Sequence, residues 1–173
     1  MALALERLSV RELFDMRLVQ TDSNFGNHLF DAATGRVVLL DFGATEAVTP
    51  ERVEQLRDLG PGLRIGDAGR IRAAALAVGF VAEQDPPAQT QAVLDMMWLA
   101  GEPLRQRGVY DFGASELFDR VFDQGRAQML GEGYARTPPP DLLFLQRKFV
   151  GTFMLCSRLQ ARLDIGALFG GHL

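Results

Sequence analysis

A β-hairpin signal near the start of the chain constrains its fold more than any other feature. Two short apolar runs, 27–30 and 36–40, flank Asp31-Ala32-Ala33-Thr34-Gly35, where Gly35 can take the positive φ that a tight turn requires. The two runs are therefore expected to pair as antiparallel strands. This pairing would bring the residues before 27 and after 40 together at the open end of the hairpin.

Helical patterns dominate the rest of the sequence. Apolar residues from Leu3 to Val19 recur at the spacing of a helix with one buried stripe, and this helix is expected to end near Gln20. Thr49-Pro50-Glu51 is typical of a helix N-terminus, and Gly60-Pro61-Gly62 is expected to interrupt the helix that begins there. Further helices are expected at about Asp67 to Gly79, Pro87 to Arg105, Ser115 to Ala135 and Pro140 to Leu163. We therefore predict a mainly α fold with one β-hairpin, of the α+β class.

Composition limits the number of domains and excludes several classes of function. The chain has 173 residues, 47% of them hydrophobic, which suits a single domain over residues 1–173. A net charge of −4 argues against nucleic acid as a partner. One cysteine, Cys156, and two histidines, His28 and His172, exclude an internal disulfide and the usual zinc sites. With no recognisable signal peptide or membrane span, the sequence predicts an intracellular protein that is soluble or peripheral to a membrane.

Three polar residues around the hairpin have the spacing of a phosphoryl-transfer site. Asp22 and Asn27 match the Asp-x-x-x-x-Asn catalytic loop of kinases, and Asp41 opens the sequence Asp41-Phe42-Gly43 directly after the hairpin. Mg²⁺ prefers oxygen ligands, and Asp41 offers a carboxylate while Asn27 offers an amide carbonyl. We therefore predict that Asn27 and Asp41 bind Mg²⁺ and ATP. Asp22 is then the catalytic residue, which accepts a hydroxyl proton or positions a water.

The alternative interpretation is that these residues are purely structural, with Asp22 and Asn27 capping a turn and Asp41 ending a strand. A second Asp-Phe-Gly sequence, Asp111-Phe112-Gly113, shows that the tripeptide alone is weak evidence. The second copy lacks an upstream apolar strand and an Asp-x-x-x-x-Asn partner, so it is interpreted as a turn entering a helix. The order of helix, loop, hairpin and apolar strand favours the first copy as the functional one.

Basic and nucleophilic residues elsewhere have simpler explanations. Lys148 is the only lysine, and in an apolar final helix it is expected to be a surface cation rather than a phosphate ligand. Cys156 is expected to be a small buried hydrophobe, and His28 to pack or face solvent. Arg147, Arg158 and Arg162 are expected to be solvated or paired, although acidic lipid headgroups are an alternative partner.

Two blocks of sequence carry a resemblance to a known family. The first includes the run from Leu13-Phe14 through Gln20 to Asn27 and then Leu39-Leu40-Asp41-Phe42-Gly43-Ala44-Thr45, and the second runs from Arg147 to Arg162. Together they resemble the UbiB-like (aarF-domain) atypical kinases, and most of all their mitochondrial, coenzyme-Q-linked branch. The resemblance implies the C-terminal lobe of a protein-kinase-like fold, Mg²⁺-dependent ATP binding, ATPase activity more readily than protein phosphorylation, and support of ubiquinone biosynthesis. It also implies coenzyme Q biosynthesis proteins as partners, and a location in the cytoplasm or peripheral to the inner membrane, on the matrix side in mitochondria.

Several family features have no counterpart here. Gln20 stands where ordinary protein kinases have the histidine of His-Arg-Asp, and no Ala-Pro-Glu follows Asp41. The family's N-terminal lobe, with its alanine-rich loop, Lys-x-Gly-Gln signature and ATP-contacting lysine, is also missing. The chain alone is therefore expected to be inactive and to need that lobe, in cis or as a separate polypeptide. The alternative function is a non-catalytic, pseudokinase-like helical interaction module, or a gene fragment.

Overall fold

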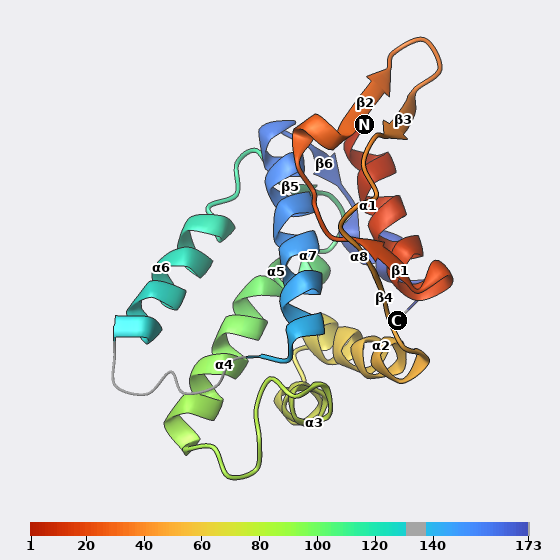
Figure 1. The fold of residues 1–173 in the computed structure, drawn as a ribbon. Coiled ribbons are helices and arrows are strands. Elements are labelled where there is room, and N and C mark those ends of the chain that lie inside the picture. The colour runs from red at the N-terminus through yellow and green to blue at the C-terminus, as the bar shows by residue number, and fades with distance from the viewer. Residues whose placement is uncertain (131–137, 173) are drawn as a thin grey trace.

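The computed structural model describes residues 1–130 and 138–172, and these residues form a mainly helical fold with short antiparallel strands (Figure 1). The predicted fold class is confirmed. In chain order the elements are α1 (Ala2–Arg11), a π-helical turn (Glu12–Met16), β1 (Leu18–Gln20), a 3₁₀ turn (Phe25–Asn27), β2 (His28–Asp31), β3 (Arg36–Leu39), β4 (Thr45–Ala47), α2 (Pro50–Ile65), α3 (Ala68–Val78), α4 (Pro87–Ala100), α5 (Glu102–Arg105), β5 (Tyr110–Asp111), α6 (Leu117–Leu130), α7 (Pro140–Arg158), β6 (Arg162–Leu163) and α8 (Ile165–Phe169).

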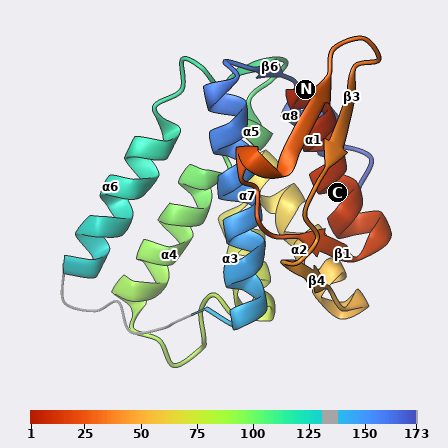
Figure 2. The ribbon, with the colours of Figure 1, turned by 45° about the horizontal axis from the view of Figure 1, so that its top comes forward.

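The predicted hairpin is present as β2 and β3, which pair from His28 with Leu39 to Asp31 with Arg36. Gly35 has a φ of 70°, as its place in the turn requires. Figure 2 shows this hairpin projecting from the helical body beside the N-terminus. Its open end, which carries the predicted site residues, faces the body.

The first helix ends earlier than predicted. Helical structure stops at Met16, because Arg17 adopts a left-handed conformation with a φ of 54°. The next residues form β1 and pair with β4, from Leu18 with Ala47 to Gln20 with Thr45. The prediction of a helix up to Gln20 was wrong here, because a three-residue strand is too short for its pattern to be separated from helical spacing.

Helix α2 continues through Gly60-Pro61-Gly62, where an interruption was expected. A Cβ on Gly62 would lie 3.1 Å from the Cβ of Arg70 and 3.2 Å from the backbone nitrogen of Ile71. The glycine therefore lets α3 pack closely against α2 instead of ending the helix. The capping signals on α3 were interpreted correctly, since the Asp67 side chain accepts a hydrogen bond from the backbone of Arg70 and Gly79 ends the helix at a φ of 93°.

Later helices differ from prediction mainly at their ends. The helix expected at 87–105 divides at Gly101 into α4 and α5, and α7 stops at Arg158 because Gln160 has a φ of 48°. The chain then forms β6, which pairs with β5, so the described residues contain two small strand pairs besides the predicted hairpin. Residues 131–135 of the helix predicted at 115–135 lie outside the described residues.

Helix α7 runs through the centre of the molecule, with α1 on one side and α4 and α6 on the other (Figure 1). Leu142, Leu155 and Cys156 are buried on α7, in agreement with the central position predicted for the last long helix. One apolar cluster joins α7 to the end of α1 and to α2, and a second joins it to β5, β6 and α8. Within the described residues, no helix is long and apolar enough to cross a membrane.

Candidate active site

The pairing of β2 with β3 places the two predicted metal ligands, Asn27 and Asp41, at the open end of the hairpin. The backbone nitrogen of Leu40 donates a hydrogen bond to the carbonyl of Asn27 over 3.0 Å, which extends the β2–β3 pairing by one residue pair. Asp41 is the next residue after this pair. The loop that contains Asp22 leads into Asn27 from the other side, so all three residues lie around the open end of the hairpin.

Asn27 contacts Asp22 directly. Its side-chain nitrogen donates to the carboxylate oxygen Oδ2 of Asp22 over 2.9 Å and to the Asp22 backbone carbonyl over 3.3 Å. Both partners can only accept, so the amide nitrogen has to face them and the amide oxygen faces away from Asp22. That oxygen accepts no hydrogen bond from any described residue, and it is the atom that a metal ion would bind.

Gln20 joins the two halves of the site. Its side chain is 3% exposed, and its amide nitrogen donates to the backbone carbonyls of Asp22, over 3.0 Å, and of Asp41, over 3.3 Å. Beside it, the backbone nitrogen and hydroxyl of Thr21 both donate to the carbonyl of Ala44. The segment before Asp22 is thus tied to the segment around Asp41. Gln20 and Thr21 were not predicted as site residues, and the only signal was their position in the family-like block.

Asp41 is exposed and does not point into the core. Its Oδ1 atom accepts a hydrogen bond from the backbone nitrogen of Gly43 over 2.7 Å, and Oδ2 has no partner among the described residues. The described part of the chain contains no cluster of three or more His, Cys, Asp and Glu side chains that could hold a metal ion. A cation at Asp41 would therefore complete its oxygen shell with the amide of Asn27, water and a phosphate ligand, as Mg²⁺ commonly does.

Asp22 also forms an ion pair with α7. The Arg147 guanidinium donates to Oδ1 of Asp22 over 2.7 Å, so each carboxylate oxygen has its own donor, Arg147 for one and Asn27 for the other. Arg147 was expected to be solvated or paired, and it is paired with the predicted catalytic residue. The Asp22 side chain remains 32% exposed, so a substrate can still reach it.

One turn of α7 supports the loop behind Asp22. The Ser23 hydroxyl donates to the carbonyl of Lys148 over 3.2 Å and lies 3.4 Å from the hydroxyl of Thr152. A Cβ on Gly151 would come within 2.7 Å of the Ser23 Cβ, closer than two such atoms approach. Gly151 is therefore required for the loop to rest on the helix.

Lys148 corrects the sequence-based interpretation. It is 3% exposed rather than a surface cation, and its ammonium group lies 2.7 Å from the carboxylate of Glu12 in the π-helical turn. Burial of a lysine requires a paired charge, and Glu12 is too distant in sequence for the pattern to reveal it. Cys156 is buried as expected, and its thiol lies 3.5 Å from the carboxylate of Glu6. Burial raises the pKa of both groups, that of Glu6 to about 7.

The second Asp-Phe-Gly sequence has a structural environment. Asp111 accepts hydrogen bonds from the backbone nitrogens of Gly113 and Ala114 and lies 3.4 Å from the guanidinium of Arg162. Phe112 is 1% exposed and packs against the rings of Tyr110 and Phe153. The segment begins at the second residue of the two-residue strand β5 and precedes α6, close to the helix-entry turn that was predicted.

Comparisons with known proteins point to one family. The model of the ABC1 atypical kinase-like domain matches residues 2–75, which include Asp22, Asn27 and Asp41. The protein named atypical kinase COQ8B, mitochondrial, of Rattus norvegicus is 36% identical over 163 residues, which are 94% of this chain and 30% of that protein. Atypical kinase COQ8, mitochondrial, of Saccharomyces cerevisiae is 27% identical over 165 residues, 94% of this chain and 32% of the relative.

A third relative, atypical kinase coq-8, mitochondrial, of Caenorhabditis elegans, is 28% identical over 166 residues, again 94% of this chain. The chain spans between 22% and 32% of the length of these relatives. The similarity therefore covers nearly all of this chain and a minor part of each of these kinases. On this sequence evidence, the chain belongs to the UbiB-like (ABC1) family of atypical kinases.

Proposed function

We propose that this chain is the C-terminal, metal-binding lobe of a UbiB-like atypical kinase or ATPase that acts on Mg²⁺-ATP. The observation that carries the proposal is the pair of hydrogen bonds from Gln20 to the backbones of Asp22 and Asp41, together with the bond from Asn27 to Asp22. These contacts hold a carboxylate, an amide and a second carboxylate at one end of the hairpin. That set of residue types, in this chain order, is the set that phosphoryl transfer uses.

The residues fit a magnesium ion by the chemistry of their donors. The free oxygen of the Asn27 amide and the free oxygen Oδ2 of Asp41 are hard ligands, and Asp41 is exposed enough to bind a hydrated cation. When bound, Mg²⁺ would neutralise charge on the phosphates of the nucleotide. Asn27 and Asp41 are the residues that would hold it.

Asp22 acts on the nucleophile in this proposal. Its carboxylate is held in one orientation by Asn27 and Arg147, and it stands on the loop that precedes the ligands. From there it accepts a proton from a hydroxyl group, or orients a water molecule, for attack on the terminal phosphate. Arg147, Ser23 and Gly151 act as positioning residues, because they fix the loop and not the reacting atoms.

The complete enzyme needs more chain than is present here. The hairpin exposes large apolar side chains around the site, with Leu29 at 55%, Leu40 at 53% and Phe42 at 61% exposure. In the proposal, an N-terminal lobe, in cis or as a separate polypeptide, covers this surface, encloses the phosphates and supplies the lysine that contacts them. Residues 1–173 are then one structural unit of the enzyme. By analogy with the mitochondrial relatives, the complete protein supports coenzyme Q biosynthesis, at the inner membrane and together with other proteins of that pathway.

Exchange of single carboxylates tests the assignment. In the complete protein, Asp41→Asn should lower Mg²⁺-dependent ATP turnover by about 100-fold or more, as expected for a lost charge contact in an active site. The matched control, Asp111→Asn, should leave turnover nearly unchanged, because the polar contacts of the Asp111 side chain with described residues are to its own turn and to Arg162. Equal losses in the two variants would contradict the choice of the first Asp-Phe-Gly copy.

Titration calorimetry separates the lobe from the alternative, a non-catalytic interaction module. The chain alone should bind ATP weakly, only with Mg²⁺ present, and without sustained hydrolysis, because one wall of the site is absent. Binding that does not depend on Mg²⁺ or on Asp41 would favour the alternative. Tight binding with steady hydrolysis by the chain alone would show that the N-terminal lobe is not needed.

A further inference from the structure

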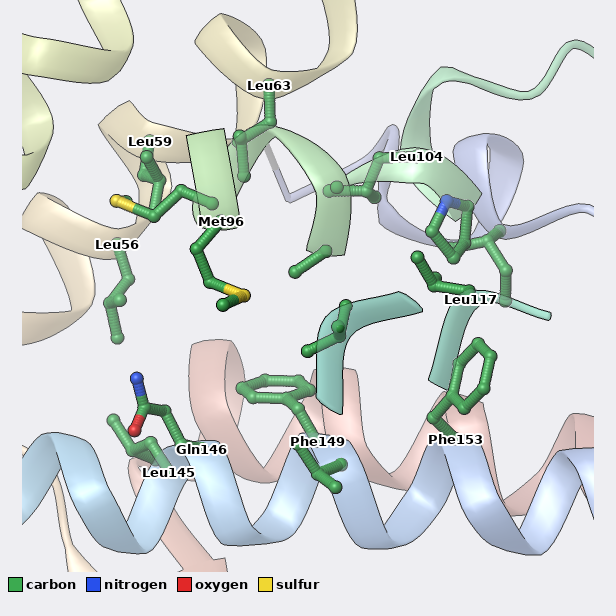
Figure 3. Close-up of a pocket in the computed structure, with 18 of the residues that line it drawn as sticks. Leu56, Leu59, Leu63, Met96, Leu104, Leu117, Leu145, Gln146, Phe149 and Phe153 are labelled. Carbon is green, nitrogen blue, oxygen red and sulfur yellow. The ribbon is translucent and has the colours of Figure 1, made fainter. Parts of the chain in front are cut away.

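A large apolar cavity lies in the helical part of the molecule (Figure 3), and no residue of the β2–β3 hairpin is among the described residues that line it. Its volume is about 410 Å³. Helix α7 forms one wall, and α2, α4 and α5 form the wall opposite, with side chains from the two walls pointing toward each other. The start of α6 closes one side. The labelled side chains of the two walls include Leu56, Leu63, Met96, Leu104, Phe149 and Phe153.

The size and the lining of the cavity are those of a small-molecule site. Small-molecule sites have volumes of roughly 300–1,000 Å³ and mostly apolar walls. Met96 and Met97 line the space, and their flexible thioethers can adapt to a ligand of variable shape.

The lining side chains favour an uncharged ligand. Among the described residues around the cavity there is no arginine, lysine or histidine, so an anionic headgroup would find no counter-charge. Glu6 is the only carboxylate there, and burial raises its pKa to about 7, so it is ionised at alkaline pH and would then repel an anion. Gln128 donates to the carbonyl of Ala92 and is already engaged.

Gln146 offers the cavity an unused polar group. Its side chain points from α7 into the space between the walls (Figure 3), and its amide makes no hydrogen bond to any described residue. An amide can both donate and accept, which matches a hydroxyl group better than a carboxylate. One end of the cavity therefore presents an uncharged hydrogen-bonding group, and most of the remaining lining is apolar.

We propose that this cavity binds a neutral single-chain amphiphile, with the alkyl chain between α7 and α4 and an uncharged head, such as an alcohol, at Gln146. The site is separate from the hairpin and does not depend on nucleotide chemistry. A negative result for this site would therefore leave the function proposed above unaffected.

Displacement of a neutral dye tests this site. N-phenyl-1-naphthylamine should become fluorescent when it binds the purified protein, and 1-decanol should displace it. At about pH 8, where Glu6 is largely ionised, decanoate of the same chain length should displace the dye at least about tenfold less effectively. The comparison of alcohol with carboxylate separates a neutral headgroup from a fatty acid.

Two substitutions on α4, one that fills the cavity and one outside it as a control, test where the ligand binds. Ala100 lies on α4 in the cavity wall, so Ala100→Phe should weaken 1-decanol binding by about tenfold or more, because the ring occupies the chain's place. Ala88 is on the same helix, exposed and outside the wall, and Ala88→Phe should leave binding within about twofold. Val150→Phe fills the cavity from the opposite wall and replaces Ala100→Phe if that variant loses its wild-type circular dichroism.

A substitution of Gln146 tests the proposed contact with the head group. Gln146→Leu should weaken 1-decanol binding while the dye, which lacks a hydroxyl group, still binds. The proposal is overturned if the cavity-filling variants bind 1-decanol as the wild type does, or if decanoate binds as tightly as the alcohol. Dye binding that matches in the Ala100→Phe and Ala88→Phe variants would likewise place the ligand elsewhere.

Discussion

The two Asp-Phe-Gly segments form the same local turn in opposite surroundings. In each, the aspartate Oδ1 accepts a hydrogen bond from the glycine backbone, over 2.7 Å at Asp41 and over 3.1 Å at Asp111. The aromatic residue between them is 61% exposed in the first copy and 1% exposed in the second. The tripeptide therefore specifies a turn, and its neighbours decide the rest.

Those neighbours are polar in the first copy and apolar in the second. At the first turn, the Gln20 side chain donates to the backbone carbonyl of Asp41 and the Gly43 nitrogen donates to Oδ1, while Oδ2 of Asp41 has no partner among the described residues. Around the second turn, Tyr110 and Phe153 hold Phe112 in the core, with ring centroids 5.0 and 5.2 Å away. Polar partners therefore determine the surroundings of the first segment, whereas packing stabilises the second. Each prediction below replaces the equivalent residue in both segments, or a residue in the surroundings of one of them.

The largest contrast is expected between the two phenylalanines. Phe112→Ala should lower the free energy of unfolding by about 3–5 kcal/mol, because it leaves a cavity among packed rings. Phe42→Ala should change it by no more than about 0.5 kcal/mol, since the ring is largely in solvent. Urea unfolding followed by circular dichroism measures both. Similar losses would mean that Phe42 is covered in solution and that the two segments are not opposites.

The sequence predicted the local hairpin better than the contacts between distant segments, for a physical reason. Asp22, Asn27 and Asp41 lie along one short stretch, and the hairpin that follows Asn27 and precedes Asp41 is local. Lys148 and Arg147 depend on partners more than a hundred positions away, Glu12 and Asp22, so no window of sequence contains the pair. The same limit explains the missed β1–β4 and β5–β6 pairs, whose strands are two or three residues long.

Tertiary contacts also decide where α2 ends. Gly60-Pro61-Gly62 has the composition of a helix break, and the helix nevertheless continues through it. Close packing of α3 on Gly62 outweighs the low helix propensity of glycine and proline. Local propensity therefore predicted the type of each long element but not every boundary, because tertiary contacts decide the boundaries.

A second prediction concerns pH, and it applies to the packed region alone. Glu6 lies beside Cys156, which belongs to the same apolar cluster as Phe112. Burial raises the pKa of Glu6 from 4.5 to about 7, so the folded state binds more protons than the unfolded state between these pH values. Stability should therefore fall as pH rises from about 4.5 to about 7, by about 3 kcal/mol at most.

The substitution Glu6→Gln should remove most of this fall, as measured by urea unfolding at a series of pH values. Glu116→Gln, at an exposed carboxylate near the second turn, should keep it. A stability that rises over the same pH range in the wild type would contradict the direction of the shift. A fall that persists unchanged in Glu6→Gln would assign it to another group.

The third prediction concerns the glycine at the end of each Asp-Phe-Gly segment, which is replaced by alanine. A Cβ on Gly113 would lie 3.0 Å from the backbone Cα of Gln160, so Gly113→Ala should cost about 1–3 kcal/mol of stability by forcing β5 and β6 apart. A Cβ on Gly43 would lie 3.2 Å from Oδ1 of Asp41 and meet no packed backbone. Gly43→Ala should therefore leave stability nearly unchanged and instead weaken Mg²⁺-dependent nucleotide binding in the complete protein. A loss of stability in Gly43→Ala, with a loss of nucleotide binding in Gly113→Ala, would contradict this assignment of the two segments.

The smallest changes in stability are expected at the two arginines that pair with the aspartates of these regions. Arg162 is 3.4 Å from Asp111, and Arg147 is 2.7 Å from Asp22, with both guanidinium groups largely exposed. Exposed pairs contribute roughly 0–1 kcal/mol, so Arg162→Gln and Arg147→Gln should both unfold almost as the wild type does.

Turnover should nevertheless separate these two variants, because only one of the ion pairs orients a group that the proposed reaction uses. Arg147→Gln removes one of the two side-chain donors that hold the Asp22 carboxylate, and a misplaced catalytic group of this kind costs roughly 10- to 100-fold in kcat. Arg162→Gln should leave kcat as it is. Since Arg147 positions Asp22 and does not bind the nucleotide in this account, KM for ATP should change little, and Arg147→Lys should recover part of the lost rate. A rise in KM with kcat preserved would show instead that Arg147 contacts the phosphates, and Asp22 would then need no support from α7.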